Sequence, residues 1–205
     1  PQAHAAQRQR CDPLQDEMQT KGNSETHPTL SPDDEFADYG IAGWEFGNLT
    51  LTEKPESPEM RTTMYLRAGL QRGLEQERTL GSNPFKFGFV GGSDVHNSLS
   101  SFEEDNFFGK LVVQEPSPLR WEHESKKGFG KTRYTWHYTA AGYAAVWATD
   151  NTREALWDAL KRREVYATSG TRLTVRFFGG WNFSSKDAQA SDIARRGYRR
   201  GVPMG

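Results

Sequence analysis

Apolar side chains recur at helical spacing between residues 58 and 80, and charged side chains fill most of the positions between them. The apolar positions are Met60, Met64, Leu66, Leu70 and Leu74. Ser57 followed by Pro58 is typical of a helix start, because the serine hydroxyl caps free N–H groups and proline fits the first turn. Gly81 stands where helices commonly end in the left-handed conformation. The pattern predicts one helix over this range.

Strand and helix signals alternate along the rest of the chain. A second helix should begin at Asn151 or Thr152, with Glu154 completing a capping box if Asn151 is the cap. Short apolar or alternating runs predict strands over residues 13–20, 84–90, 165–167 and 173–177. This order of elements predicts an α/β fold, either layered or a barrel.

The 205 residues fit one domain, which we place at residues 13–205. Residues 1–12 carry almost no large apolar side chain and should form a frayed lead-in. Four prolines and an acidic run between residues 25 and 58 predict a long irregular excursion with at most short helices. Loops of this length within a domain are usually functional or poorly ordered.

The charge balance limits the classes of partner. Because 26 basic residues face 27 acidic ones, the chain lacks the positive field of a general nucleic-acid binder. Basic and aromatic residues alternate over residues 126–138 and could stack on single-stranded bases, but an exposed loop is the favoured interpretation. No apolar run approaches a membrane span. The single cysteine, Cys11, cannot form an intrachain disulfide, and the sequence leaves compartment and oligomeric state open.

The sharpest chemical signal follows the predicted strand at residues 84–90. Asp94 and His96 are two residues apart, so on an extended chain their side chains project to the same side. A carboxylate and an imidazole suit Zn²⁺, Mn²⁺ or Fe²⁺, and Asn97 could orient one of the two ligands. The alternative is a turn in which the aspartate caps a helix and the histidine is satisfied within the protein.

Two further segments carry candidate chemistry. Glu25 and His27 repeat the spacing of a carboxylate and an imidazole after a probable strand, and two such pairs would converge if the strands share a sheet. An Asx-type turn with both side chains in solvent is the alternative. Residues 168–172 combine hydroxyls, backbone amides and the Arg172 guanidinium, which can cradle a phosphate or carboxylate, although a plain turn is the favoured interpretation.

Several motifs together resemble the domain of unknown function 3604 family. They lie at residues 21–28, 31–38, 83–88, 92–97, 151–154, 164–172 and 176–180. The family is similar to the PHP (polymerase and histidinol phosphatase) metallohydrolases, whose distorted β/α barrel holds two or three metal ions. The resemblance implies that Asp94 and His96 form the last ligand motif and that Glu25 is an earlier carboxylate ligand. The His-x-His motif of PHP proteins has no match, so we expect the chain to be a C-terminal portion carrying part of the metal site.

The resemblance implies a partial, distorted β/α barrel with long irregular loops. It also implies a metal-dependent hydrolase of phosphoesters that acts on a small and anionic substrate. Asp94, His96, Glu25 and His27 are the expected metal ligands. Lys21 or Arg172 would neutralise charge that develops on the substrate. The competing hypothesis is a non-catalytic binding module that keeps the barrel without metal.

Overall fold

The computed structural model describes residues 14–19, 22–48, 50–96, 117–139, 142–169 and 172–204. Its central sheet has the order β2-β1-β3, formed by Gly22–Asn23, Leu14–Gln19 and Gly88–Gly91. β1 runs antiparallel to β2 and parallel to β3. Met18 of β1 is 1% exposed and belongs to the core. The strand predicted over residues 13–20 is confirmed, and the one predicted over residues 84–90 begins later, at Gly88.

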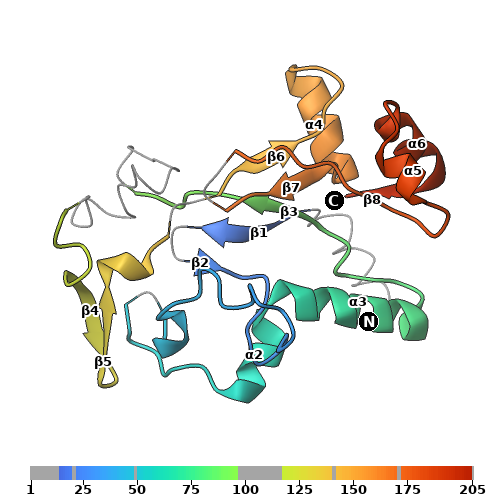
Figure 1. Ribbon diagram of the computed structural model, residues 1–205. Helices are drawn as coiled ribbons and strands as arrows, with labels where there is room; N and C mark the ends of the chain where they lie inside the picture. The colour runs from blue at the N-terminus through green and yellow to red at the C-terminus, as the bar shows by residue number, and fades with distance from the viewer. Residues whose placement is uncertain are drawn as a thin grey trace.

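A second pair of strands lies beside β3 (Figure 1). β6 (Ala144–Val146) pairs antiparallel with β7 (Val165–Ala167). A Cβ atom built on Gly88 would lie 2.7 Å from Val165 Cγ2, and one built on Gly91 would lie 3.2 Å from the Thr168 carbonyl oxygen. The two strands therefore pack closely through glycine and run in the same direction. As a result, β1, β3 and β7 all have their carboxyl ends at one end of the molecule.

The helix predicted over residues 58–80 is present as two helices, α2 (Pro58–Met64) and α3 (Leu66–Leu80). Ser57 accepts a hydrogen bond from the Met60 N–H, and Gly81 ends α3 in the left-handed conformation, as predicted.

The break between α2 and α3 falls at Tyr65, which is extended at φ −108° and ψ 144°. Its cause is tertiary. The N–H groups of Leu66 and Arg67 donate to the carbonyl oxygens of Ser24 and Glu25, at 2.9 and 3.0 Å, instead of to the preceding helical turn. α3 therefore begins against the segment that follows β2.

The second predicted helix is α4 (Arg153–Arg162), and its cap is Thr152, which accepts a hydrogen bond from the Ala155 N–H. Figure 1 shows α4 and α3 on opposite sides of the strands. The strand predicted over residues 173–177 is wrong. Side chains occupy the hydrogen-bonding positions that a neighbouring strand would need, because the Tyr166 hydroxyl donates to the Leu173 carbonyl oxygen at 2.9 Å and accepts from the Val175 N–H at 3.2 Å.

Residues 124–134 form a hairpin of β4 (Glu124–Gly128) and β5 (Lys131–Tyr134), so the exposed loop favoured from the sequence is also wrong. A short 3₁₀ helix, η4 (Thr135–His137), follows it. Arg133 of β5 is fully buried and lies 4.1 Å from the Trp44 ring centroid. Its guanidinium donates to three backbone carbonyl oxygens, those of Gly43, Gly47 and Asn48. Arg133 therefore fixes the loop around η1 (Trp44–Phe46), the one regular element between residues 25 and 57 within the described residues.

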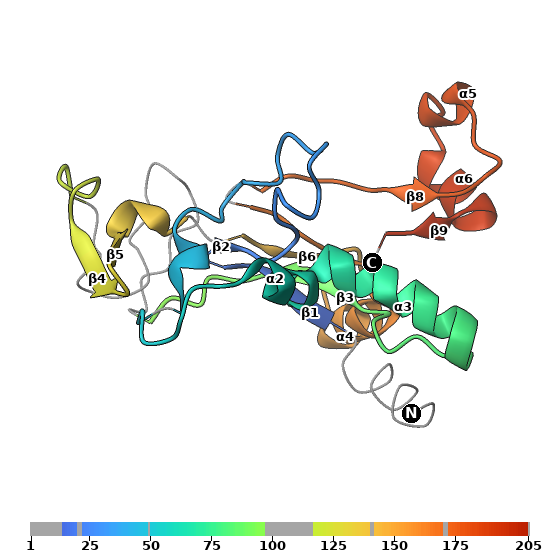
Figure 2. The ribbon, with the colours of Figure 1, turned by 90° about the horizontal axis from the view of Figure 1, so that it is seen from below.

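The last part of the chain forms a small unit that projects from the strands (Figure 2). β8 (Phe178–Gly179) pairs antiparallel with β9 (Val202–Pro203), and α5 (Ser185–Ala188) and α6 (Ile193–Arg200) lie between them in the sequence. Asp187 holds this unit together, because its carboxylate accepts from Arg196 and Arg200 at 3.0 and 2.7 Å. The described residues thus form helices and small sheets, and the α/β fold and the partial barrel stay predictions. Within the described residues, no helix is both long and apolar enough to cross a bilayer.

Candidate functional site

Asp94 and His96 lie just beyond the carboxyl end of β3, and their side chains meet. Asp94 Oδ1 is 3.2 Å from His96 Nε2, and both side chains are partly exposed. Asp94 adopts a left-handed backbone conformation with φ 47°, which non-glycine residues rarely adopt outside turns and functional sites. Two ligands of a tetrahedral zinc ion, with bonds of about 2.0–2.1 Å, lie about 3.4 Å apart. The observed separation fits such an ion as well as it fits a hydrogen bond.

A second carboxylate, that of Asp16, approaches this end of β3 from the neighbouring strand. Gly92 donates its N–H to the Met18 carbonyl oxygen at 2.8 Å, and a Cβ atom built on Gly92 would lie 3.7 Å from Asp16 Oδ2. Asp16 also accepts a hydrogen bond from Gln19. Asp16 was not among the site residues predicted from the sequence. The signal that could have pointed to it is an acidic side chain inside a predicted strand. Within the described ranges, no three His, Cys, Asp or Glu side chains gather closely enough to hold a metal ion.

Glu25 and His27 lie elsewhere and have their own partners. The Glu25 N–H donates to Asn23 Oδ1, which forms the Asx-type turn considered above, and the Glu25 carboxylate pairs with Arg67. His27 is 8% exposed, and its Nδ1 accepts from the Thr29 N–H at 3.1 Å. Burial lowers the pKa of His27 below its usual value. The side chains of Glu25 and His27 thus have different partners, Arg67 and Thr29. His27 is also buried, whereas the turn interpretation placed both side chains in solvent.

A cavity of about 390 Å³ brings Glu25 together with residues from β1 and from the end of β7. Glu17, Thr168 and Ser169 line the same cavity. Burial, with repulsion from the Glu25 and Asp16 carboxylates, raises the pKa of Glu17 to about 7. A carboxyl group with this pKa can accept or donate a proton near neutral pH. The raised pKa of Glu17 could not be predicted from the sequence, because it depends on how deeply the folded chain buries this side chain.

The segment after β7 is fixed by Tyr143, the residue just before β6. Thr168 is buried, its N–H donates to the Tyr143 carbonyl oxygen, and its hydroxyl accepts from the Tyr143 N–H, both at 3.1 Å. The Arg172 guanidinium lies 5.1 Å from the Tyr143 ring centroid. Arg172 therefore follows the carboxyl end of β7, the same end at which Asp94 and His96 follow β3. Lys21, the other predicted cation, lies outside the described residues.

Comparison with known proteins identifies the family. The profile of a family described as "Protein of unknown function (DUF3604)" matches residues 1–205. The chain belongs to the DUF3604 family. No curated protein and no solved structure gave a significant match.

Membership of the DUF3604 family confirms the resemblance found in the sequence. The kinship with PHP metallohydrolases and the assignment as a C-terminal portion stay predictions. Within this DUF3604 chain, the structure brings together the side chains of Asp94 and His96 and gathers Glu17 and Glu25 around a second site.

Proposed function

We propose that this DUF3604 chain supplies part of the active site of a metal-dependent hydrolase acting on phosphoesters. The observation that carries the proposal is the 3.2 Å approach of Asp94 Oδ1 to His96 Nε2 beyond the carboxyl end of β3. Sites in α/β proteins gather at the carboxyl ends of parallel strands, and β1 and β7 end on the same side as β3. The carboxylate and imidazole suit a divalent zinc, manganese or iron ion.

Asp94, His96 and Arg172 would each have a separate role in this site. Asp94 and His96 would hold the ion, which when bound lowers the pKa of a water molecule and polarises the phosphoryl oxygen. The Arg172 guanidinium follows the carboxyl end of β7, so it could pair with an anionic substrate at the same end of the strands. Glu25 would have to leave Arg67 before it could reach a metal ion.

The test is a titration of the full-length protein with Zn²⁺ and Mn²⁺, followed by an assay with a generic phosphoester. Asp94→Ala and His96→Ala should each lower the metal content and abolish hydrolysis. His123→Ala is the matched control, because His123 is exposed and lies in a different segment, before β4. If both site variants keep the metal stoichiometry and hydrolysis of the parent, the proposal is refuted.

A binding module without metal is the second candidate, and the partners of Glu25 and His27 favour it. The Glu25 carboxylate pairs with Arg67, and His27 Nδ1 bonds to Thr29, so these two expected metal ligands already have partners within the protein. Such a module should unfold at the same temperature with and without a chelator. A metal-dependent hydrolase should gain thermal stability from the ion that it binds.

A further inference from the structure

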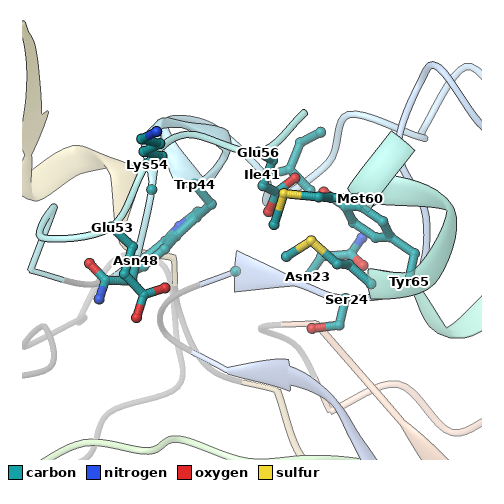
Figure 3. Close-up of a pocket in the computed structure, with 13 residues that line it drawn as sticks. Asn23, Ser24, Ile41, Trp44, Asn48, Glu53, Lys54, Glu56, Met60 and Tyr65 are labelled. Carbon is teal, nitrogen blue, oxygen red and sulfur yellow. The ribbon is translucent and has the colours of Figure 1, made fainter. Parts of the chain in front are cut away.

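Two features beside the proposed hydrolase site have no role in it. One is a cavity next to the carboxyl end of β1, where Glu53 and Tyr65 lie on opposite sides (Figure 3). The carboxylate of Glu56 in this cavity already pairs with Arg61, whose Nε is 3.6 Å away. The other feature is the segment at residues 173–177, which exposes main-chain groups as well as side chains.

Residues 173–177 lead into β8 as an extended stretch of chain (Figure 2). All five residues are exposed, and the stretch contains no turn or bend. In an extended chain the N–H and C=O groups of successive residues point to opposite edges. Within the described residues, this segment belongs to none of the small sheets. It therefore has two edges at which main-chain groups need partners.

One edge of the segment is satisfied, mostly by side chains. The Tyr166 hydroxyl bridges the Leu173 carbonyl oxygen and the Val175 N–H. The Trp147 indole N–H donates to the Val175 carbonyl oxygen at 2.9 Å, and both main-chain groups of Phe177 also have partners. These contacts hold the segment extended, so the opposite edge has a fixed shape.

The opposite edge consists of the main-chain groups of Thr174 and Arg176. Within the described residues, neither their N–H groups nor their carbonyl oxygens form a hydrogen bond. An extended chain with open N–H and C=O groups along one edge is a template for another strand. A peptide that adds such a strand gains affinity from main-chain hydrogen bonds and specificity from alternate side chains.

The side chains of this segment alternate in character. Leu173, Val175 and Phe177 project to one face and are 59%, 41% and 63% exposed. Thr174 and Arg176 project to the other face. A strand added along the open edge would continue both faces, so its own side chains should alternate between apolar and polar.

The charge around the segment is positive. Arg176 donates to the Tyr198 hydroxyl at 2.8 Å, and within the described part of the chain it pairs with no carboxylate. Residues 173–204 carry six basic side chains and two acidic ones. A second copy of this chain is a poor partner, because an antiparallel pair centred on Thr174 would place Arg172 of one copy opposite Arg176 of the other. Acidic side chains complement this face.

We propose that residues 173–177 bind an extended peptide segment of a partner protein as an added strand. The main-chain groups of Thr174 and Arg176 hold this strand. Its acidic side chains lie on the face of Arg176, and its apolar side chains lie on the face of Val175. The open edge, the exposed apolar face and the positive charge all match a peptide in which acidic and apolar residues alternate.

Fluorescence anisotropy of the full chain with a labelled peptide that alternates glutamate and valine tests the proposal. This peptide should bind saturably, and the peptide with lysine in place of glutamate should bind at least about tenfold more weakly. N-methylation of one central glutamate and of one central valine should differ in effect by at least about tenfold, because only alternate N–H groups of the peptide face the protein.

Thr174→Pro removes an open N–H group and should weaken binding at least about tenfold, whereas Thr174→Ala keeps that group and should bind like the parent. If Thr174→Pro fails to fold, the two methylated peptides decide the matter with the parent chain alone. No saturable binding, equal affinity for the lysine peptide, or equal effects of the two methylations would each overturn the proposal. Dimerisation of the chain that Thr174→Pro abolishes would assign the edge to a second copy and overturn it as well.

Discussion

Replacing Glu17 by glutamine should stabilise the folded protein at alkaline pH and have little effect under mildly acidic conditions. Burial raises the pKa of Glu17 from 4.5 to about 7, and the nearby carboxylates of Glu25 and Asp16 add to the rise. Since the folded state holds this proton more tightly than the unfolded chain, the free energy of unfolding falls as pH rises between these two values. The difference between the two pKa values corresponds to at most about 3 kcal/mol of unfolding free energy, and this contribution is fully lost above the higher pKa.

Urea denaturation of the parent and of Glu17→Gln between about pH 5 and about pH 8 measures this effect. The difference in unfolding free energy should be near zero at the acidic end and should grow in favour of the variant to about 1–3 kcal/mol at the alkaline end. Glu122→Gln, in an exposed position before β4, is the control and should follow the parent. Parallel stability profiles for parent and Glu17→Gln would refute the argument, because they would mean that Glu17 ionises alike in both states.

Three further predictions follow from the packing. Arg133→Leu leaves carbonyl oxygens without donors and should lower the unfolding free energy by about 3 kcal/mol in urea denaturation; an unchanged midpoint would contradict the role assigned to that guanidinium. Gly142→Ala should lower the melting temperature, because the added Cβ would overlap the Thr168 carbonyl oxygen. Gly69→Ala, where α3 has open space, should be neutral or stabilising by up to about 1 kcal/mol. Equal effects of the two substitutions would disprove this contrast. Asp187→Asn should destabilise the chain at neutral pH and progressively less in acid, since hydrogen bonds from Ser184, and then from Arg196 and Arg200, hold the pKa of that carboxyl below the usual range. A pH-independent loss in thermal melts would argue against it.

Local signals in the sequence located the helix ends well. Ser57, Gly81 and Thr152 act through atoms within a few residues of themselves, so their roles can be predicted without tertiary structure. The break at Tyr65 could not be predicted, because the competing acceptors lie about forty residues earlier in the chain. The alternation at residues 173–177 failed for a related reason: an alternating pattern favours a strand only where a neighbouring strand offers its backbone.

The candidate site likewise contains residues that local spacing predicts and residues that only the tertiary structure brings together. Asp94 and His96 meet because their spacing is local, whereas Asp16 reaches Gly92 only because β1 and β3 are parallel neighbours. Two ligand pairs converge at the end of a sheet only if each directly follows a parallel strand.

Glu25 does not directly follow a parallel strand, because β2 reverses the chain after β1. Gly22 pairs with Gln19, Asn23 pairs with Met18, and the Ser24 N–H donates to the Glu17 carbonyl oxygen at 2.9 Å. The chain thus runs back along β1 and carries Glu25 to the cavity that Glu17 lines. The reversal of two residues in β2 therefore separates Glu25 from the pair formed by Asp94 and His96 and places it beside Glu17.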